Sequence, residues 1–251
     1  MLSKNKIKFF NSLKLRKFRI KHNLFLAEGE KLVFNLLQSE IKPKFILTTS
    51  KELIPADKYY NFEIFEVNNS DINKISQLKT PPSIIGIFEI PDYKINFAEI
   101  ENSLSIFCDD IQNPGNLGTI IRTADWFGIE TVFCSKNTVD VYNPKTIQAT
   151  MGSIASVKIH YINKPYFFSS LNKKIPVYGT LLEGENIYTA NLSKNGIIII
   201  GNEGKGISED INSYITNRLF IPDFNTKNKS AESLNVSVAA AIVCSEFKRR
   251  K

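Results

Sequence analysis

The sequence predicts an α/β protein with two parts, a C-terminal domain built on a parallel sheet and a small N-terminal α/β domain. Strand-like and helix-like stretches alternate along most of the 251 residues, more clearly in the second half. Several strand-like stretches there, such as "SLSIFC" and "GIIII", are apolar throughout, which is typical of parallel strands covered on both faces. Sheets of this kind bind ligands at the carboxyl ends of their strands, so we expect the site there.

The N-terminal part combines a basic helix with a helix and three strands. Residues 3–22 predict one basic helix, and Leu32, Val33, Leu36 and Leu37 have helical spacing. Residues 44–49, 62–67 and 83–90 predict strands, and a short helix begins near Asp71, a plausible N-cap. The polar segment that opens with Pro91 predicts a linker. The predicted division is therefore an N-terminal domain at 1–95, a linker at 96–102 and a C-terminal domain at 103–251.

Predicted strands and helices alternate regularly in the C-terminal part. A helix follows "NPGN" and ends at Gly128, and another has Pro144 in its first turn. The closing helix, after Asn235, is apolar nearly all round and is therefore expected to be buried. The remaining segments predict strands, at 103–110, 129–135, 157–162, 175–182, 195–200 and 217–223.

Positive charge is concentrated at the two ends of the chain. The formal net charge is +7, residues 1–27 hold eight Lys or Arg and no acid, and the chain ends in "KRRK". Clustered cations indicate a polyanionic partner, most often nucleic acid. A solvated basic face in a lysine-rich composition explains the same charges, so charge alone leaves both interpretations open.

Composition also argues against several other classes of protein. No apolar run approaches the roughly eighteen residues that span a membrane, so we expect a soluble, cytoplasmic protein without membrane association. Cys108, Cys134 and Cys244 lie in apolar contexts and are expected to be buried free thiols. With only two histidines and no cysteine pair at zinc spacing, we expect no metal site.

Three polar loops follow predicted strands. In the first, Asn116 is a plausible cap for the next helix, and Arg122 stands six residues later among apolar neighbours. Taken alone, a single arginine on an otherwise apolar helix is more simply explained by solvent exposure. In the third loop, Ser233 and Asn235 stand before the closing helix, where capping is the simplest explanation.

The second loop, "GNEGKG", begins at Gly201 and places Glu203 among glycines, which allow a ligand to approach the backbone closely. A tight turn with a solvated acid is the alternative. The loop does not match a phosphate-binding P-loop. A dinucleotide fingerprint with Asp223 as its acidic residue is closer, but too few residues follow for the rest of that fold.

Taken together and in this order, "NPGNLGTIIRTADWFG", "IIIIGNEGKGIS" and "IPDF…AESLNVSVAAAIV" resemble the three motifs of the SpoU–TrmH family, RNA 2′-O-ribose methyltransferases of the SPOUT superfamily. The similarity spans roughly residues 103–248. More loosely, the first part resembles the RNA-binding domain of many ribosomal-RNA members, which is similar to kink-turn-binding ribosomal proteins. The loop at 223–231 is longer than the commonest spacing in the family.

The resemblance implies a trefoil knot, a homodimer, S-adenosylmethionine as cofactor and RNA as substrate, with ribosomal RNA favoured over tRNA. Its motif positions imply two sets of residues. The implied catalytic set is Asn116, Arg122, Glu203, Ser233 and Asn235. The implied cofactor-binding set is Gly201, Ile221 and Leu234. Two alternatives stay open at this stage, a non-catalytic RNA-binding protein of the same fold and a nucleotide-dependent oxidoreductase.

Overall fold

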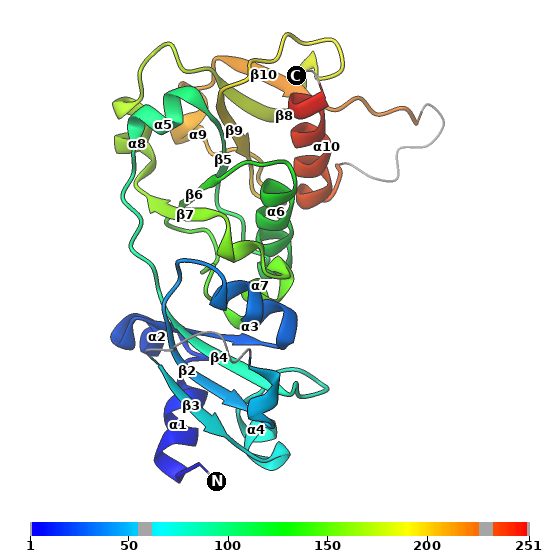
Figure 1. The fold of residues 1–251 in the computed structure, drawn as a ribbon. Helices are drawn as coiled ribbons and strands as arrows, with labels where there is room; N and C mark the ends of the chain where they lie inside the picture. Colours follow the sequence, from blue (N-terminus) through cyan, green and yellow to red (C-terminus); the bar gives the residue numbers. More distant parts are fainter. Residues whose placement is uncertain (1, 55–61, 226–232, 250–251) are drawn as a thin grey trace. The chain divides into compact units, whose positions relative to one another are not determined.

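The computed structural model describes residues 2–54, 62–225 and 233–249 of the chain. It divides into two compact units (Figure 1). The first unit holds residues 1–92 together with 140–156, and the second holds residues 93–139 and 157–251. The segment 140–156, which lies inside the expected C-terminal domain, therefore packs with the N-terminal unit.

The first unit is built on a four-stranded mixed sheet in the order β1-β4-β2-β3. β4 pairs antiparallel with β1 and β2, whereas β2 and β3 run parallel. Three of these strands were predicted, and β1 was missed because it runs directly into the next helix. The strands are β1 (Leu24–Glu28), β2 (Pro43–Thr48), β3 (Glu63–Glu66) and β4 (Ile84–Glu89).

The predicted basic helix is two helices, α1 (Lys4–Ser12) and α2 (Arg16–His22). Arg19 explains the break, because its guanidinium donates to the free carbonyl oxygens of Leu13 and Lys14 at 2.9 and 2.8 Å. Its side chain is only 3% exposed and is paired with Asp140, Nη2 to Oδ2 at 2.6 Å. Arg19 is therefore a structural cation rather than part of the exposed basic surface.

Two further helices and a short 3₁₀ turn complete the N-terminal part: α3 (Glu30–Leu37), α4 (Asn69–Ile75) and η1 (Lys51–Leu53). The predicted cap of α4 was wrong by three residues. Asn68 caps the helix by accepting from the backbone N–H of Asp71 at 2.8 Å. Asp71 itself is buried, and it accepts a hydrogen bond from the backbone N–H of Leu2.

Residues 140–156 contribute α7 (Pro144–Thr150) and the 3₁₀ turn η2 (Ser153–Ala155) to the first unit. Tyr142 packs on Phe25 of β1, with 4.9 Å between ring centroids. Gly152 has φ +104°, and a Cβ there would lie 2.3 Å from the side chain of Asn35. A close approach of this kind is open to glycine, which stands here between α7 and η2.

The second unit is built on a six-stranded, entirely parallel sheet in the order β10-β8-β9-β5-β6-β7. This confirms the predicted parallel sheet. The carboxyl ends of β5 and β9, which are neighbours, carry the first and second polar loops to the same edge. The strands are β5 (Leu104–Cys108), β6 (Thr131–Ser135), β7 (Lys158–Ile162), β8 (Val177–Asn186), β9 (Gly196–Ile200) and β10 (Asn217–Phe220).

Helices cover both faces of this sheet (Figure 1). α6 and α10 lie side by side on one face, and α5, α8 and α9 lie on the other. α5 lies within the segment that we expected to be a linker, and its Ile100 joins the apolar core. The helices are α5 (Phe97–Asn102), α6 (Pro114–Trp126), α8 (Lys164–Ser170), α9 (Glu209–Asn212) and α10 (Val236–Arg249).

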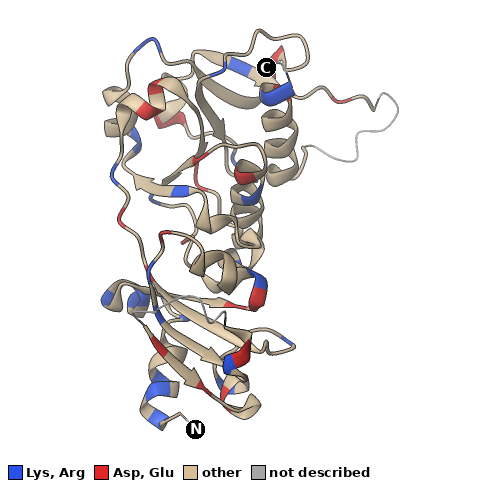
Figure 2. Cartoon of the chain, in the orientation of Figure 1, with Lys and Arg blue, Asp and Glu red and all other residues tan. Residues whose placement is uncertain are grey.

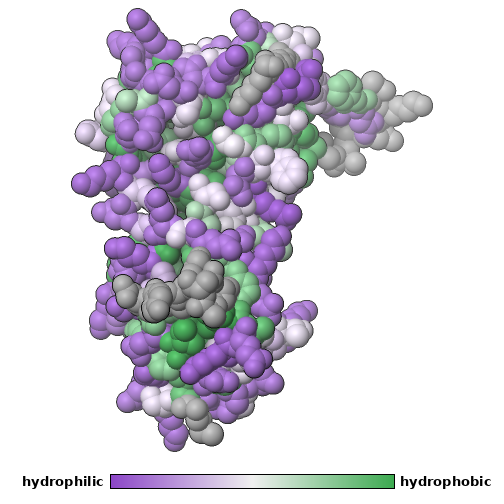
Figure 3. Space-filling model, in the orientation of Figure 1, coloured by the Kyte–Doolittle hydropathy of each residue, from purple (hydrophilic) through white to green (hydrophobic). Residues whose placement is uncertain are grey.

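Basic and apolar groups lie at the surface of both units (Figures 2 and 3). Lys and Arg lie along α1 and α2 (Figure 2), and Lys4, Lys8, Lys17 and Lys21 are all exposed. In the second unit, green apolar atoms lie beside α10 (Figure 3). Among the residues that the structure describes, no helix is long and apolar enough to cross a membrane.

Candidate active site

The loop after β5 is organised by Asn113, which caps α6. Its Oδ1 accepts from the backbone N–H groups of Gly115 at 2.8 Å and Asn116 at 3.3 Å. Pro114 occupies the first turn, where its missing N–H costs nothing. We expected Asn116 to be the cap, and this was wrong because the helix begins two residues earlier. The side chain of Asn116 is thereby free for another role.

Glu203, from the loop after β9, holds the first loop in place. Its Oε1 accepts from Asn116 Nδ2 at 3.0 Å and from the backbone N–H of Asn113 at 3.3 Å. Its Oε2 accepts from the backbone N–H of Gln112 at 3.4 Å. Partial burial opposes ionisation of this carboxyl, but these hydrogen bonds outweigh it and lower the pKa of Glu203. The carboxylate is thus kept ionised where it meets Asn116.

Asn235 connects the third loop to the same point. Its Nδ2 donates to Asn116 Oδ1 at 3.2 Å. Its Oδ1 accepts from the backbone N–H groups of Ser237 at 2.9 Å and Val238 at 3.4 Å, which confirms the predicted cap on α10. The amide of Asn116 therefore bridges Glu203 and Asn235, and the three loops meet. Ser233 and Leu234 are exposed immediately before Asn235.

Arg122 lies six residues, about 1.7 turns, beyond Asn116 on α6 and is exposed. In the described part of the chain, no hydrogen bond or ion pair joins it to the other four residues of the predicted catalytic set. Glu203 fixes the nearby backbone of Gln112 and Asn113 instead of Arg122. The guanidinium is instead available to a ligand at the surface.

The turn after β9 closes on itself and depends on two of its glycines. Gly206 has φ +69°, and a Cβ on Gly201 would lie 2.5 Å from the carbonyl carbon of Gly206. Asn202, which our sequence interpretation missed, holds this turn. Its Oδ1 accepts from the N–H groups of Gly204 and Lys205, both at 3.0 Å, and its Nδ2 donates to Asp110 O at 2.7 Å. A polar residue beside a glycine turn is a weak signal in a sequence.

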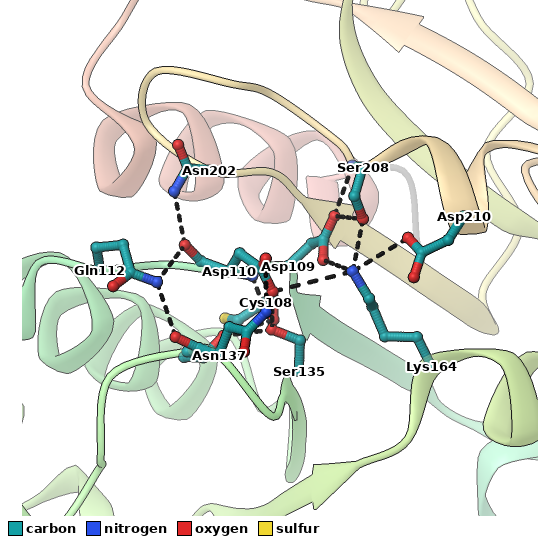
Figure 4. Close-up of polar contacts among 11 residues, drawn as sticks. Cys108, Asp109, Asp110, Gln112, Ser135, Asn137, Lys164, Asn202, Ser208 and Asp210 are labelled. Atoms are coloured by element: carbon teal, nitrogen blue, oxygen red, sulfur yellow. Dashed lines mark hydrogen bonds and ion pairs between the residues drawn. The ribbon is translucent and has the colours of Figure 1, made fainter.

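A buried ion network lies beside this turn (Figure 4). Asp109, at the end of β5, has a side chain only 1% exposed. Lys164, the first residue of α8, donates to Asp109 Oδ1 at 3.1 Å and to Ser208 Oγ at 2.7 Å. The sequence alone does not indicate these partners of Asp109, because Lys164 and Ser208 lie 55 and 99 residues away from it.

Two residues of the predicted cofactor set lie at the carboxyl ends of β9 and β10, which flank β8 in the sheet, and the third precedes α10. Gly201 directly follows β9, and Ile221, which is half-buried, directly follows β10. Leu234 is 50% exposed before α10, and Leu182 of β8 is 77% exposed. Backbone groups at strand ends next to exposed apolar side chains suit a ligand with an apolar body and polar groups. The residues present therefore fit an adenosyl amino acid.

The described residues do not support thiolate or metal-ion chemistry. Cys108, Cys134 and Cys244 are buried and free, as predicted. The hydrogen bond with Cys134, followed by burial, raises the pKa of Cys108, and burial raises that of Cys244 to about 12. Neither is a thiolate near neutral pH. Among the described residues, no group of three or more His, Cys, Asp or Glu is arranged to hold a metal ion.

The parallel sheet, its glycine turn and the three joined polar loops define an α/β protein with a polar ligand site at the carboxyl edge of its sheet. The chain belongs to the SpoU rRNA methylase family, whose model matches residues 103–245. The model of the MRM3-like substrate-binding domain matches residues 4–86. These matches confirm the family that the motifs predicted.

Relatives along the whole chain agree with this assignment. The Bacillus subtilis 23S rRNA (guanosine(2553)-2′-O)-methyltransferase RlmP is 33% identical over 95% of this chain and 94% of its own length. A TrmH-family protein of Porphyromonas gingivalis has a solved structure with a TM-score of 0.88 and 38% identity, covering both chains fully. An AdoMet-bound rRNA methyltransferase of Sinorhizobium meliloti is 28% identical with a TM-score of 0.85, covering 100% of this chain and 96% of that one.

Proposed function

We propose that this protein transfers a methyl group from S-adenosylmethionine to a ribose 2′-hydroxyl of ribosomal RNA. The observation that carries the proposal is the bridge in which Asn116 bonds both Glu203 and Asn235. It joins three polar loops at the edge of the sheet where a cofactor is expected. Membership of the SpoU rRNA methylase family supports the same reaction.

Gly201, Ile221 and Leu234 would hold the cofactor. Gly201 and Ile221 offer backbone groups at the ends of β9 and β10, and Leu234 offers an exposed apolar side chain. The cofactor supplies an activated methyl group on a sulfonium centre. The AdoMet-bound structure of the Sinorhizobium meliloti relative supports this choice of cofactor.

The reaction forms a bond between the 2′-oxygen and the methyl carbon, breaks the sulfur–carbon bond, and releases the hydroxyl proton. A ribose hydroxyl is a weak nucleophile near neutral pH, so the site must favour the developing alkoxide. Arginine keeps its proton in proteins. We therefore assign Arg122 as a clamp that binds the adjacent phosphate through two N–H groups and stabilises the developing charge.

The other members of the proposed catalytic set position the substrate. Asn116, fixed at both ends of its amide by Glu203 and Asn235, would contact the ribose. The exposed hydroxyl of Ser233 would hold the RNA beside the third loop. Residues 226–232, which include most of the unusually long loop, lie outside the described residues.

RNA binding is assigned to the N-terminal domain. The exposed lysines of α1 and α2 would contact RNA phosphates, and the match of residues 4–86 to a substrate-binding domain supports this role. We propose that residues 1–95 bind RNA and that residues 103–251 carry out methyl transfer, with a trefoil knot in the last part. A ribosomal substrate favours a cytoplasmic location.

The decisive experiment compares 2′-O-methylation across total ribosomal RNA in cells with and without this protein. We expect one or a few sites to lose methylation, and the first to examine corresponds to the guanosine named for the Bacillus subtilis relative. Purified protein should then restore the mark on unmodified RNA with S-adenosylmethionine. Loss of a mark in tRNA alone would favour tRNA as the substrate, and no change would favour a non-catalytic RNA-binding protein.

We also propose that the protein is a homodimer that associates through α6 and α10. Trp126 at the end of α6 is 84% exposed and Val238 on α10 is 48% exposed, and large apolar side chains of this kind are typical of interfaces. Trp126→Lys should shift sedimentation from dimer to monomer. The matched control is Tyr166→Lys on the opposite face of the sheet, which is 73% exposed in the wild type. A dimeric Trp126→Lys protein would exclude this surface.

A further inference from the structure

The ion network beside the glycine turn lies outside the set of residues proposed to contact substrate or cofactor. Asp109 is nearly inaccessible, and a buried carboxylate is costly unless it is paired and hydrogen-bonded. Its Oδ2 accepts from the backbone N–H of Ser208 at 2.7 Å and from its Oγ at 2.6 Å. Its Oδ1 accepts from Lys164 at 3.1 Å. Both oxygens are therefore occupied.

The ammonium group of Lys164 also has a full set of hydrogen-bond partners in this network. Its ammonium contacts Asp109 Oδ1, Ser208 Oγ at 2.7 Å and Asp210 Oδ1 at 3.1 Å. Three acceptors suit the three hydrogens of an ammonium group. The side chain is 13% exposed, and Asp110 Oδ1 is 3.9 Å away. Burial opposes its protonation, but the hydrogen bonds that it donates to Asp210 and Asp109 outweigh this effect and raise the pKa of Lys164.

Ser208 connects this network to the glycine turn after β9. It occupies the N-cap position of α9, yet its side chain makes no capping hydrogen bond. Its hydroxyl is committed to Asp109 and Lys164 instead (Figure 4). Ser208 is also the last residue of the turn that starts at Gly201. The network therefore fixes the far end of the turn, while Asn202 and Glu203 fix its beginning.

We propose that Lys164 is a positioning residue for the methyl-donor site, acting through Asp109 and Ser208 to hold the turn 201–208 in its binding conformation. The inference rests on the proposed function, since it takes Gly201 to be part of the cofactor site. Without the ammonium, Asp109 would be a buried charge lacking its counter-ion, and its hold on Ser208 would loosen.

The first test measures binding of S-adenosylhomocysteine by calorimetry in the full-length protein. Lys164→Met should weaken binding by about tenfold, the scale of one lost hydrogen bond to a charged group. The matched control is Lys158→Met, because Lys158 forms an exposed ion pair with Glu99 at 3.7 Å. It should bind as the wild type does. Unchanged affinity in a folded Lys164→Met protein would overturn the proposal.

The second test is amide hydrogen exchange without any ligand. Lys164→Met should speed exchange selectively in residues 201–208, and RNA affinity should stay at the wild-type value. Faster exchange throughout the sheet, with RNA and S-adenosylhomocysteine affinities falling together, would show general destabilisation and would also overturn the proposal. If Lys164→Met fails to fold, Lys164→Met/Asp109→Asn removes both charges and keeps an oxygen acceptor for Ser208. Weaker S-adenosylhomocysteine binding is again expected, because Ser208 Oγ still loses the hydrogen bond that it accepts from Lys164, and unchanged binding would overturn the idea.

Different results would contradict the proposed function and the positioning role of Lys164. A wild-type protein that methylates no RNA, while Lys164→Met still changes S-adenosylhomocysteine affinity and local exchange, would contradict the proposed function alone. Normal RNA methylation by the wild type, with no selective effect of Lys164→Met on cofactor affinity or exchange, would contradict the positioning role alone.

Discussion

The side-chain amide of Asn116 donates to Glu203, with 3.0 Å between Nδ2 and Oε1. The two residues are 87 positions apart in the sequence and come from loops after adjacent strands. Because Glu203 also accepts from two backbone N–H groups of the first loop, one carboxylate sets the position of the helix start that carries Asn116. This relationship makes both residues sensitive to changes of charge.

Asn116→Asp should impair methyl transfer strongly. It places a second carboxylate against Glu203 and removes the donor of their hydrogen bond, so kcat/KM for RNA should fall by about 10- to 100-fold. Steady-state transfer from S-adenosylmethionine measures this. The control is Asn172→Asp, since exposed Asn172 accepts from the N–H of Lys174 and an aspartate can do the same. Wild-type kinetics in Asn116→Asp would show that the bridge is unimportant.

Glu203 should stabilise the fold in a pH-dependent way. Its folded-state pKa lies below the ordinary value of 4.5, because hydrogen bonds outweigh partial burial. Its stabilising contribution is therefore present above the unfolded-state pKa and is lost as the pH falls through the lower folded-state pKa. Urea denaturation should show wild type more stable than Glu203→Gln at pH 7, with the difference shrinking below about pH 4. A difference independent of pH would contradict this assignment.

Arg122→Lys tests the phosphate clamp, because lysine keeps the charge but loses the planar fork. We expect kcat/KM for RNA to fall by about tenfold or more, with S-adenosylhomocysteine affinity unchanged. Since Arg122 is exposed, the free energy of unfolding should change by less than about 0.5 kcal/mol. Arg16→Lys, at another exposed arginine, serves as the control. Methylation at the wild-type rate by Arg122→Lys would rule out the clamp.

The exposed lysines of α1 and α2 should determine the salt dependence of RNA binding. Replacing Lys4, Lys8, Lys17 and Lys21 by Gln should weaken binding and reduce the slope of log K against log salt by about 0.7 to 0.9 for each RNA phosphate that a lysine no longer neutralises. Affinity for S-adenosylhomocysteine should not change. Lys173→Gln/Lys174→Gln, at exposed sites in the other unit, is the control. An unchanged slope in the quadruple variant would place the RNA elsewhere.

The sequence by itself determined the parallel sheet, its strand positions and the family. Uniformly apolar strands, a proline in the first turn of α7 and Gly128 at the end of α6 are local signals, and each appears where predicted. The motif order placed Asn116, Glu203 and Asn235 in three separate loops. Their hydrogen-bonded contact follows from the parallel topology, which brings strand ends to one edge.

Tertiary structure alone decided which polar groups pair. Arg19 looked like one more exposed cation, but the break between α1 and α2 and the carboxylate of Asp140 make it a buried one. Asn113 rather than Asn116 caps α6, because cap position depends on where the backbone turns. Asp109, Lys164 and Ser208 carry no local pattern. Buried charges must find partners in space, wherever those partners stand in the sequence.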